Sequence, residues 1–292
     1  MIKNYRTALV TGASYGIGPF IARALAREGM NLVLAARSGE ELEQVASEVR
    51  ATGVQVLPVV TDVTERDALD ALVDTARRTF GSVDVLVNNA GRDLQREFHT
   101  YSADDVEALI RLNLSGPIEL TRLLLPEMLR RQQGYIVNIS SIGGSVGFPY
   151  TEVYSAAKDG LIAFTRVLRA DYQKQGVSAS ALILGPIRDA GTGARTMEEL
   201  NLPPSALGKA FMSPPQAVAQ AVIKSIRRDR AELVIMPGPG RLMRALMTLF
   251  PGMGPAMNQM TGSVQVMKQV ADARERQRTQ LNAQPAHPVE LR

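Results

Sequence analysis

Two side chains that can exchange protons stand four residues apart in the run "YSAAK", residues 154–158. On a helix, this spacing places the phenol of Tyr154 and the ammonium of Lys158 on one face. A neighbouring positive charge favours the phenolate and so lowers the pKa of a tyrosine. The pair is therefore either a tuned acid–base group or a surface pair that water solvates, and the elements around it must decide between the two.

Few other residue types in this chain can do chemistry. Its 292 residues include no cysteine and only two histidines, His99 and His287. The lack of cysteine excludes disulfides, thiolate nucleophiles and cysteine–metal sites. With so few histidines we expect neither a Ser-His-Asp triad nor a metal site. Any acid–base catalysis would then depend on Tyr154.

Composition narrows the class of protein further. Hydrophobic residues make up 45% of the chain, and the net charge is +4 without a dominant basic tract. These values predict a substantial core and give no case for nucleic-acid binding. No apolar run approaches the ~18 residues of a membrane span, and no secretory signal precedes the first apolar run. We expect a cytoplasmic protein.

Short apolar, β-rich runs alternate with amphipathic helical runs along most of the chain. Such alternation predicts an α/β fold, a Rossmann-type doubly wound parallel sheet in three layers with helices on both faces. We expect a catalytic domain over residues 1–240 and a C-terminal extension over 241–292, helical at first and then frayed. The predicted strands are 7–11, 31–36, 54–60, 83–91, 134–141 and 177–184, with 232–238 as a seventh, and one long helical region covers about 103–132.

The first strand runs directly into "TGASYGIG", which contains Gly12, Gly16 and Gly18. Between a strand and a helix, glycines let the backbone approach a pyrophosphate, and the helix N-terminus offers N–H groups to the anion. Pro19 suits the first turn of that helix. An ordinary glycine turn is the alternative, but we favour a dinucleotide site.

The second strand ends in "LAARS", where dinucleotide sites commonly place an acidic residue on the ribose 2′-hydroxyl. Here Ala36 is followed by Arg37, whose guanidinium suits a 2′-phosphate. We therefore expect NADP(H) rather than NAD(H), with a surface arginine as the alternative. Asp62 after the third strand either accepts the adenine amino group or caps the next helix. The "NNAG" after the fourth strand is a weak signal alone.

The fifth strand ends in "NISSIGG", and Ser141 precedes Tyr154 by thirteen residues. Both would lie at the carboxyl edge of the sheet, where open α/β folds bind ligands. With these residues in place, the chain resembles a short-chain dehydrogenase/reductase of the common single-domain type. The motifs "TGASYGIG", "NNAG", "RLNLSG" with Asn113, Ser141 and "YSAAK" come in the family's order over about residues 5–190.

The resemblance implies a role for each member of the acid–base set. Tyr154 would pass a proton to or from the substrate oxygen, and Lys158 would hold the nicotinamide ribose and lower the pKa of Tyr154. Ser141, chosen over Ser140 by its spacing to the tyrosine, would orient the substrate oxygen. Asn113 would hold a water that links Lys158 to solvent.

The resemblance also implies cofactor contacts, with two departures in the loop after the sixth strand. Leu184 stands where relatives have proline, and Asp189 replaces the usual threonine near the carboxamide, for which Thr192 could substitute. Tyr15 is a milder departure, because small or basic residues are common there. The implied contacts are Gly12, Ser14, Tyr15, Gly16, Ile17, Gly18, Arg37, Asp62, Val63, Asn89, Ala90, Tyr154, Lys158 and Ile187.

The residues after the sixth strand give information about the substrate. Residues 189–213 are rich in small residues and form either a loop that closes over substrate, as in relatives, or a plain connection. Seven of the twelve methionines lie between Met236 and Met267. We favour core packing or an oligomer interface for this segment, then an apolar channel wall, then a membrane-surface contact. The third option rests on a short helix with Arg241 and Arg244 beside Leu242, Met243, Leu246 and Met247.

Together these residues predict an NADP(H)-dependent oxidoreductase that interconverts a carbonyl and an alcohol on an apolar small molecule. A homo-oligomer is implied by the resemblance alone. Two alternatives stay open: a dinucleotide-sensing protein without turnover, and a membrane-peripheral lipid reductase. A pure sensor has no need of the whole set Asn113, Ser141, Tyr154 and Lys158, and this chain has all four.

Overall fold

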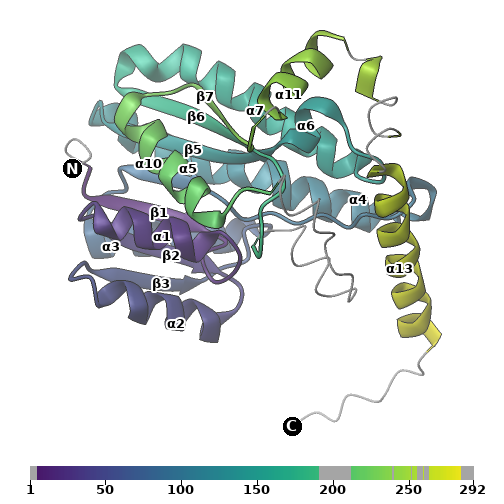
Figure 1. Cartoon of the computed structure of the whole chain (residues 1–292). Helices are drawn as coiled ribbons and strands as arrows, with labels where there is room; N and C mark the ends of the chain where they lie inside the picture. Colours follow the sequence, from purple (N-terminus) through teal and green to yellow (C-terminus); the bar gives the residue numbers. More distant parts are fainter. Residues whose placement is uncertain are drawn as a thin grey trace.

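The fold is built on one sheet of seven parallel strands in the order β3-β2-β1-β4-β5-β6-β7 (Figure 1). The computed structural model describes residues 5–190, 212–238, 240–250, 252–254, 259 and 263–283. The order confirms the predicted Rossmann-type sheet. Its strands are β1 (Thr7–Thr11), β2 (Asn31–Ala36), β3 (Val56–Val60), β4 (Val85–Asn88), β5 (Gly134–Ser141), β6 (Val177–Leu184) and β7 (Glu232–Ile235).

The central strands are buried along their whole length because helices cover both faces of the sheet. Every residue of β1 and β6 is buried, as a parallel sheet between two helical layers requires. Strand β4 is shorter than the predicted 83–91, so most of the "NNAG" motif follows the strand instead of continuing it. That placement brings the motif to the carboxyl edge.

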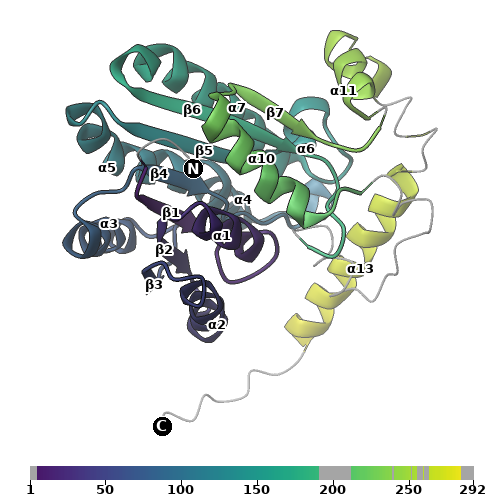
Figure 2. The ribbon, with the colours of Figure 1, turned by 60° about the vertical axis from the view of Figure 1, so that its left-hand side comes forward.

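Helices form two layers, one on each face of the sheet (Figure 2). One apolar core lies between the sheet and the layer of α1, α2 and α10. The other lies beneath α3, α5 and α7. These helices are α1 (Gly18–Arg27), α2 (Gly39–Arg50), α3 (Arg66–Phe80), α5 (Gly116–Arg130), α7 (Glu152–Tyr172) and α10 (Pro215–Arg228).

The long helical region predicted over 103–132 is interrupted. Helix α4 (Ala103–Ile110) begins with a capping box, in which Ser102 and Asp105 exchange hydrogen bonds of 3.1 Å. A π-helical turn, η2 (Arg111–Ser115), then separates α4 from α5. Such turns are rare and occur frequently at functional sites. This one contains Asn113.

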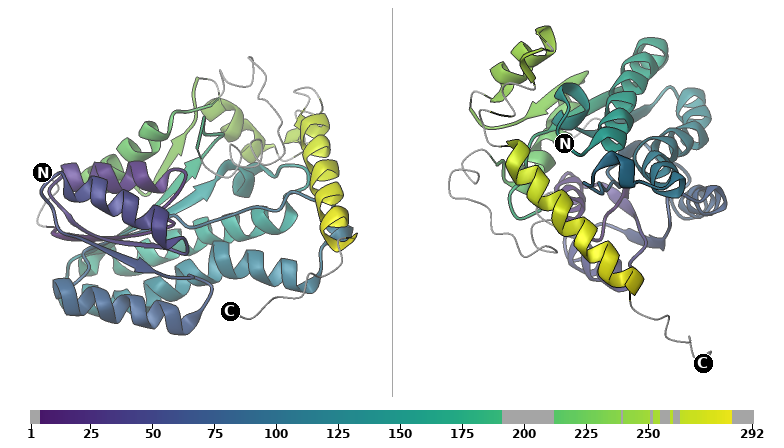
Figure 3. Two further views of the ribbon diagram at one scale, coloured as in Figure 1. Left: turned by 90° about the horizontal axis from the view of Figure 1, so that it is seen from below. Right: turned by 90° about the vertical axis from the view of Figure 1, so that its right-hand side faces the viewer.

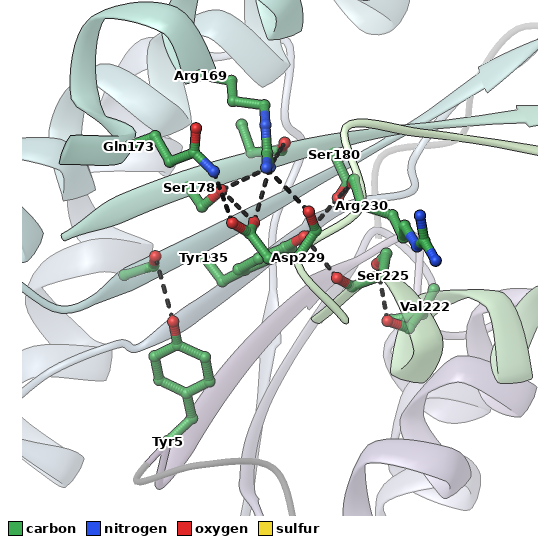
Figure 4. Close-up of polar contacts among 12 residues, drawn as sticks. Tyr5, Tyr135, Arg169, Gln173, Ser178, Ser180, Val222, Ser225, Asp229 and Arg230 are labelled. Carbon is green, nitrogen blue, oxygen red and sulfur yellow. Dashed lines mark hydrogen bonds and ion pairs between the residues drawn. The ribbon is translucent and has the colours of Figure 1, made fainter. Parts of the chain in front are cut away.

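The amino ends of β5 and β6 are fastened to α7 and α10 by a partly exposed polar cluster far from the motifs (Figure 4). Arg169 of α7 donates at 2.7 Å to both Ser178 of β6 and Asp229, the residue that ends α10. Gln173 donates to the same aspartate at 2.7 Å. Tyr135 of β5 donates to the carbonyl of Ser225 at 2.6 Å. These bonds fasten β5, β6, α7 and α10 to one another.

The C-terminal part adds α11 (Gly240–Leu249) and α13 (Ser263–Ala283). Helix α13 crosses the carboxyl edge of the sheet (Figure 3), where Arg278 donates to the carbonyl of Thr100, in the short helix η1 (Phe98–Thr100), at 3.3 Å. Of the polar stretch 271–292, which the sequence predicts to be frayed, residues 271–283 are instead helical, held by this contact and by the buried Val270. None of the helices in the described part of the chain has the length and apolar content that crossing a bilayer requires.

Candidate active site

The glycine-rich loop joins β1 to α1 beside the first turn after β4. Gly12 adopts φ +63°, and a Cβ there would lie 2.9 Å from the Cα of Ala90, so only glycine fits. The residue before α1, Ile17, provides no side-chain cap for the helix. The Gly18 N–H donates to the carbonyl of Tyr15 at 3.3 Å and Pro19 has no N–H, so the attraction for an anion here comes chiefly from the helix dipole.

The "NNAG" motif holds this loop in shape. Asn89 donates from Nδ2 to the carbonyl oxygens of Thr11 at 2.9 Å and Gly12 at 3.0 Å. The Thr11 hydroxyl accepts from the main-chain N–H groups of Asn89 at 3.0 Å and Ala90 at 3.1 Å. The other amide atom, Oδ1 of Asn89, is buried and meets no hydrogen-bond partner within the described residues. A hydroxyl of a bound ligand would satisfy it.

Arg37 and Asp62 lie at the ends of β2 and β3. The Arg37 side chain is 68% exposed, and its Nη1 is 3.8 Å from Oδ2 of Asp62, a loose ion pair. Asp62 uses Oδ1 to accept from the N–H and the hydroxyl of Thr64, at 2.9 and 2.8 Å. Because α3 has Glu65 at its N-cap position, the idea that Asp62 caps this helix is wrong. The adenine contact stays a prediction, as does that of the buried Val63.

The side chains of Asn113 and Lys158 both lie next to Gly91, the last residue of "NNAG". A Cβ at Gly91 would lie 2.9 Å from Oδ1 of Asn113 and 3.1 Å from Nζ of Lys158. Asn113 is fully buried, and its Nδ2 donates to the carbonyls of Arg92 at 2.8 Å and Leu109 at 3.0 Å. Its Oδ1 accepts from the N–H of Arg92 at 3.2 Å. The asparagine is therefore fixed in one orientation.

Lys158 lies under Tyr154 on the same face of α7, as the four-residue spacing predicts. Its Nζ is 5.7 Å from the centre of the tyrosine ring and donates to the carbonyl of Ile139 at 3.0 Å. An ammonium has three donors, and this bond uses one. The side chain is 4% exposed, and burial lowers the pKa of Lys158 to about 8. At neutral pH the group is still mostly charged.

Ser140 and Ser141 have different surroundings. Ser140 is buried and donates to the carbonyl of Lys158 at 2.8 Å. Ser141 is partly exposed and accepts from the N–H of Gly143 at 3.1 Å, which caps α6 (Ile142–Val146). Because the Ser141 oxygen accepts in this bond, its hydrogen can be donated to a ligand. The role of Ser141 in orienting a substrate stays a prediction.

Helix α6, absent from the predicted elements, packs against α7 and so connects the two segments that carry the predicted catalytic residues. A Cβ on Gly144 would lie 2.7 Å from the main-chain nitrogen of Asp159 and 2.8 Å from the carbonyl carbon of Lys158. The glycines of "NISSIGG" thus allow α6 to pack directly on the backbone of α7. This packing fixes the position of Ser141 relative to Lys158.

The remaining predicted contacts lie on two loops. Tyr15 is 51% exposed and Ser14 is partly exposed, both on the glycine loop. Ile187 is paired with Ser213 in a parallel bridge and is partly buried. Asp189 is exposed and adopts φ +56°. Thr192, the proposed substitute for the usual threonine, lies outside the described residues, as does most of the predicted loop over 189–213.

Residue-by-residue reasoning missed a buried acidic group beside this site. Asp93 follows Arg92, is 6% exposed, and accepts the N–H of Leu94 at 2.8 Å. Burial raises the pKa of Asp93 to about 7, and the charge of Glu152 adds to this while Arg274 of α13 opposes it. The only available signal was an acidic residue two positions after "NNAG". Within the described residues, no group of three histidines or carboxylates could hold a metal ion.

Comparison with known proteins agrees with this arrangement. Residues 6–200 match the family model described as short chain dehydrogenase. The ketoacyl reductase HetN of Nostoc sp. is 38% identical over 234 residues, which cover 80% of this chain and 79% of that protein. An uncharacterized oxidoreductase of Staphylococcus aureus is 35% identical over 189 residues, covering 65% of this chain and 81% of the relative.

Two solved structures with bound cofactor have the same fold. A metagenomic short-chain oxidoreductase in complex with NADP has a TM-score of 0.67 and 30% identity, covering 80% of this chain and 97% of that one. A single-residue variant of actinorhodin polyketide ketoreductase, solved with NADPH, has a TM-score of 0.72 and 31% identity, covering 80% of this chain and 96% of that one.

Proposed function

Because the chain belongs to the short-chain dehydrogenase/reductase family, we propose that it is an NADP(H)-dependent oxidoreductase that interconverts a ketone and a secondary alcohol. The relatives with a stated activity or ligand are a ketoacyl reductase and a polyketide ketoreductase with NADPH. We therefore propose an apolar acyl chain that carries a ketone as the substrate class. The observation that carries the proposal is the meeting of Asn113 and Lys158 at Gly91 beneath Tyr154.

The residues of this chain fit the cofactor. The uncapped start of α1 would hold the pyrophosphate, and the buried Oδ1 of Asn89 would accept a ribose hydroxyl. Arg37 is exposed and only loosely paired, so it can turn to a 2′-phosphate. Lys158 has donors left for the nicotinamide ribose. When bound, NADPH supplies the hydride that the carbonyl carbon receives.

The chain itself supplies the proton and the orientation. Ser141 donates its hydroxyl to the substrate oxygen and directs the carbonyl towards the cofactor side of the sheet. Tyr154 gives its phenolic proton to that oxygen in reduction and takes it back in oxidation. The ammonium of Lys158 stabilises the phenolate left behind. Asn113, fixed by three hydrogen bonds, keeps the route from Lys158 to solvent in place.

The test is NADPH oxidation with ketoacyl thioesters and simple ketones of graded chain length. Tyr154→Phe removes only the phenolic hydroxyl, and we expect turnover to fall by at least about 10²-fold with NADPH binding retained. Tyr172→Phe, at the other end of α7, is the matched control and should keep full activity.

Two outcomes would contradict the proposal. Turnover that survives Tyr154→Phe would remove the tyrosine from the chemistry. Tight NADPH binding without turnover on any substrate, in wild type and variant alike, would favour the dinucleotide-sensing alternative.

A further inference from the structure

Helix α11 presents a continuous row of exposed apolar side chains. Leu242, Leu246 and Leu249 are spaced by four and three residues, which places them on one face of the helix, and Phe250 and Met253 follow just after its end. The opposite side of α11 is packed: Met247 is 8% exposed, and the helix lies against α6. The exposed row, here called the α11 face, consists of Leu242 (65% exposed), Leu246 (38%), Leu249 (71%), Phe250 (57%) and Met253 (40%).

Charge is distributed unevenly along the chain, and its excess lies in the part that contains this face. Residues 240–292 contain seven lysines and arginines against three aspartates and glutamates, an excess of +4 that equals the net charge of the whole protein. The sequence of α11 itself contains no acidic residue. Among the exposed charged residues of α13, the basic Lys268 and Arg276 outnumber the acidic Asp272. An anionic partner would therefore be attracted to this part of the molecule.

The sequence predicts Arg244 as part of a basic helix face at a membrane surface, but the structure places it elsewhere. Its side chain is 16% exposed and lies 3.8 Å from Glu232 of β7, so it attaches α11 to the edge of the sheet. Met247 is likewise buried, not part of an exposed face. The exposed apolar surface is instead completed by Leu249 and Phe250, which sequence reasoning had not included.

The size of the α11 face favours a lipid partner over a protein partner. A helix of ten residues is about 15 Å long and about 10 Å wide, so its footprint is far smaller than the ~800 Å² per partner of a stable protein interface. An amphipathic helix at a bilayer surface needs only to bury its apolar face among the lipids. Helix α11 also lies at the periphery, beyond the edge strand β7 (Figures 1 and 2). We propose that the α11 face docks this protein on the surface of an anionic lipid bilayer.

Docking would place the bilayer beside the candidate active site. Helix α11 packs against α6, and α6 begins directly after Ser141. An apolar ketone dissolved in the bilayer would then reach the carboxyl edge of the sheet without crossing bulk water. This consequence rests on the proposed function, whereas the docking itself does not.

The experiment is flotation of the full chain with vesicles of phosphatidylcholine alone or mixed with phosphatidylglycerol. We expect binding to the anionic vesicles that weakens at about 0.5 M NaCl, because salt screens the attraction. The double variant Leu249→Glu/Phe250→Glu should bind at least roughly tenfold more weakly. Val167→Glu, which adds a charge at a 60% exposed site on α7, is the matched control and should float like wild type.

Thermal melting would show that both variants are folded, and light scattering would give their oligomeric state. Wild type that fails to float, or a double variant that floats equally well, would overturn the proposal. A double variant that dissociates an oligomer, in a protein without lipid binding, would assign the face to a contact between copies of this chain. Flotation does not depend on turnover. A failure of lipid binding can therefore be distinguished from a failure of the proposed enzymatic activity.

Discussion

Ser140 donates its hydroxyl to the main-chain carbonyl of Lys158 at 2.8 Å, and this bond ties the end of β5 to the middle of α7. The next residue of β5 is Ser141, and Tyr154 lies one helical turn before Lys158. This buried hydrogen bond therefore helps, together with the packing of α6 on α7, to fix the position of β5 relative to the helix that carries Tyr154 and Lys158. Its neighbour in sequence, Ser141, makes no such structural bond to α7 in the described hydrogen-bond network and accepts from Gly143 instead.

The first prediction distinguishes the structural role of Ser140 from the proposed catalytic role of Ser141. Ser140→Ala should lower the free energy of unfolding by about 1 kcal/mol and change kcat by only a few-fold. Ser141→Ala should cost a similar amount of stability, because the N-cap of α6 is lost, but lower kcat by about 10²-fold. Ser141→Thr keeps the hydroxyl and should restore part of the rate. Equal effects of the two alanine variants on kcat would contradict this assignment.

The second prediction concerns the buried ammonium of Lys158. Burial lowers its pKa from 10.5 to about 8, so between these pH values the unfolded state binds more protons than the folded state. The stability of the wild-type protein should therefore rise as the pH increases through this window, by about 2 to 3 kcal/mol. Urea unfolding without cofactor at about pH 7 and pH 10 measures the change.

Lys158→Met provides the reference for that experiment. The variant lacks the buried charge, so it should be more stable than wild type near neutral pH, and the difference should shrink as the pH rises towards the ordinary pKa of a lysine. A difference that stays constant across this range would show that the lysine does not titrate as its burial implies.

The third prediction tests the meeting point at Gly91. A methyl group there would lie 2.9 Å from Oδ1 of Asn113, which would have to shift, and 3.1 Å from Nζ of Lys158, which would have to give by a smaller amount. Gly91→Ala should displace both side chains and lower kcat/KM by at least about tenfold. Gly252→Ala, where a Cβ meets nothing within 4 Å, is the control and should leave the rate unchanged.

The fourth prediction concerns Asp93, whose pKa burial raises from 3.8 to about 7. Between these values the folded state holds a proton that the unfolded state has lost, so stability falls as the pH rises through this window. Asp93→Asn keeps an oxygen that accepts from Leu94 but carries no charge. The variant should match wild type near about pH 4 and be more stable at about pH 8 by a few kcal/mol, measured by urea unfolding. A gap between the two proteins that does not change with pH would contradict the titration of this carboxyl.

The sheet could be predicted from the sequence because parallel strands buried on both faces are short, mainly apolar runs. The runs "TALVT" and "VSASALIL" are of this kind, with only small hydroxyl residues among the apolar ones. The pairing of Tyr154 with Lys158 followed from helical periodicity. The interruption at Asn113 did not, because a π-helical turn has no side-chain pattern of its own. Helix α6 was missed since its five residues are too few to show a period.

Contacts between distant segments were also beyond sequence reasoning. The polar end of α13 has no apolar stripe to mark it as ordered, and it is held by Arg278 reaching Thr100, 178 residues away. The environment of Asp93 depends on the same docking, because Arg274 comes from that helix. Propensity and spacing describe neighbours along the chain, whereas these contacts arise from the tertiary fold.

The last prediction tests the proposed choice of cofactor at Arg37. Its guanidinium is 68% exposed and 3.8 Å from Asp62, so little holds it away from a ligand. A charge-assisted bond to a 2′-phosphate is worth about 1.5 to 3 kcal/mol, and a carboxylate at the same position would repel that phosphate and accept a ribose hydroxyl. Arg37→Asp should therefore shift the ratio of kcat/KM for NADPH to that for NADH by roughly 10- to 100-fold towards NADH. Arg78→Asp, on the outer side of α3, makes the same charge change away from the site and should leave the ratio as it is. An unchanged ratio in Arg37→Asp would mean that other residues recognise the phosphate.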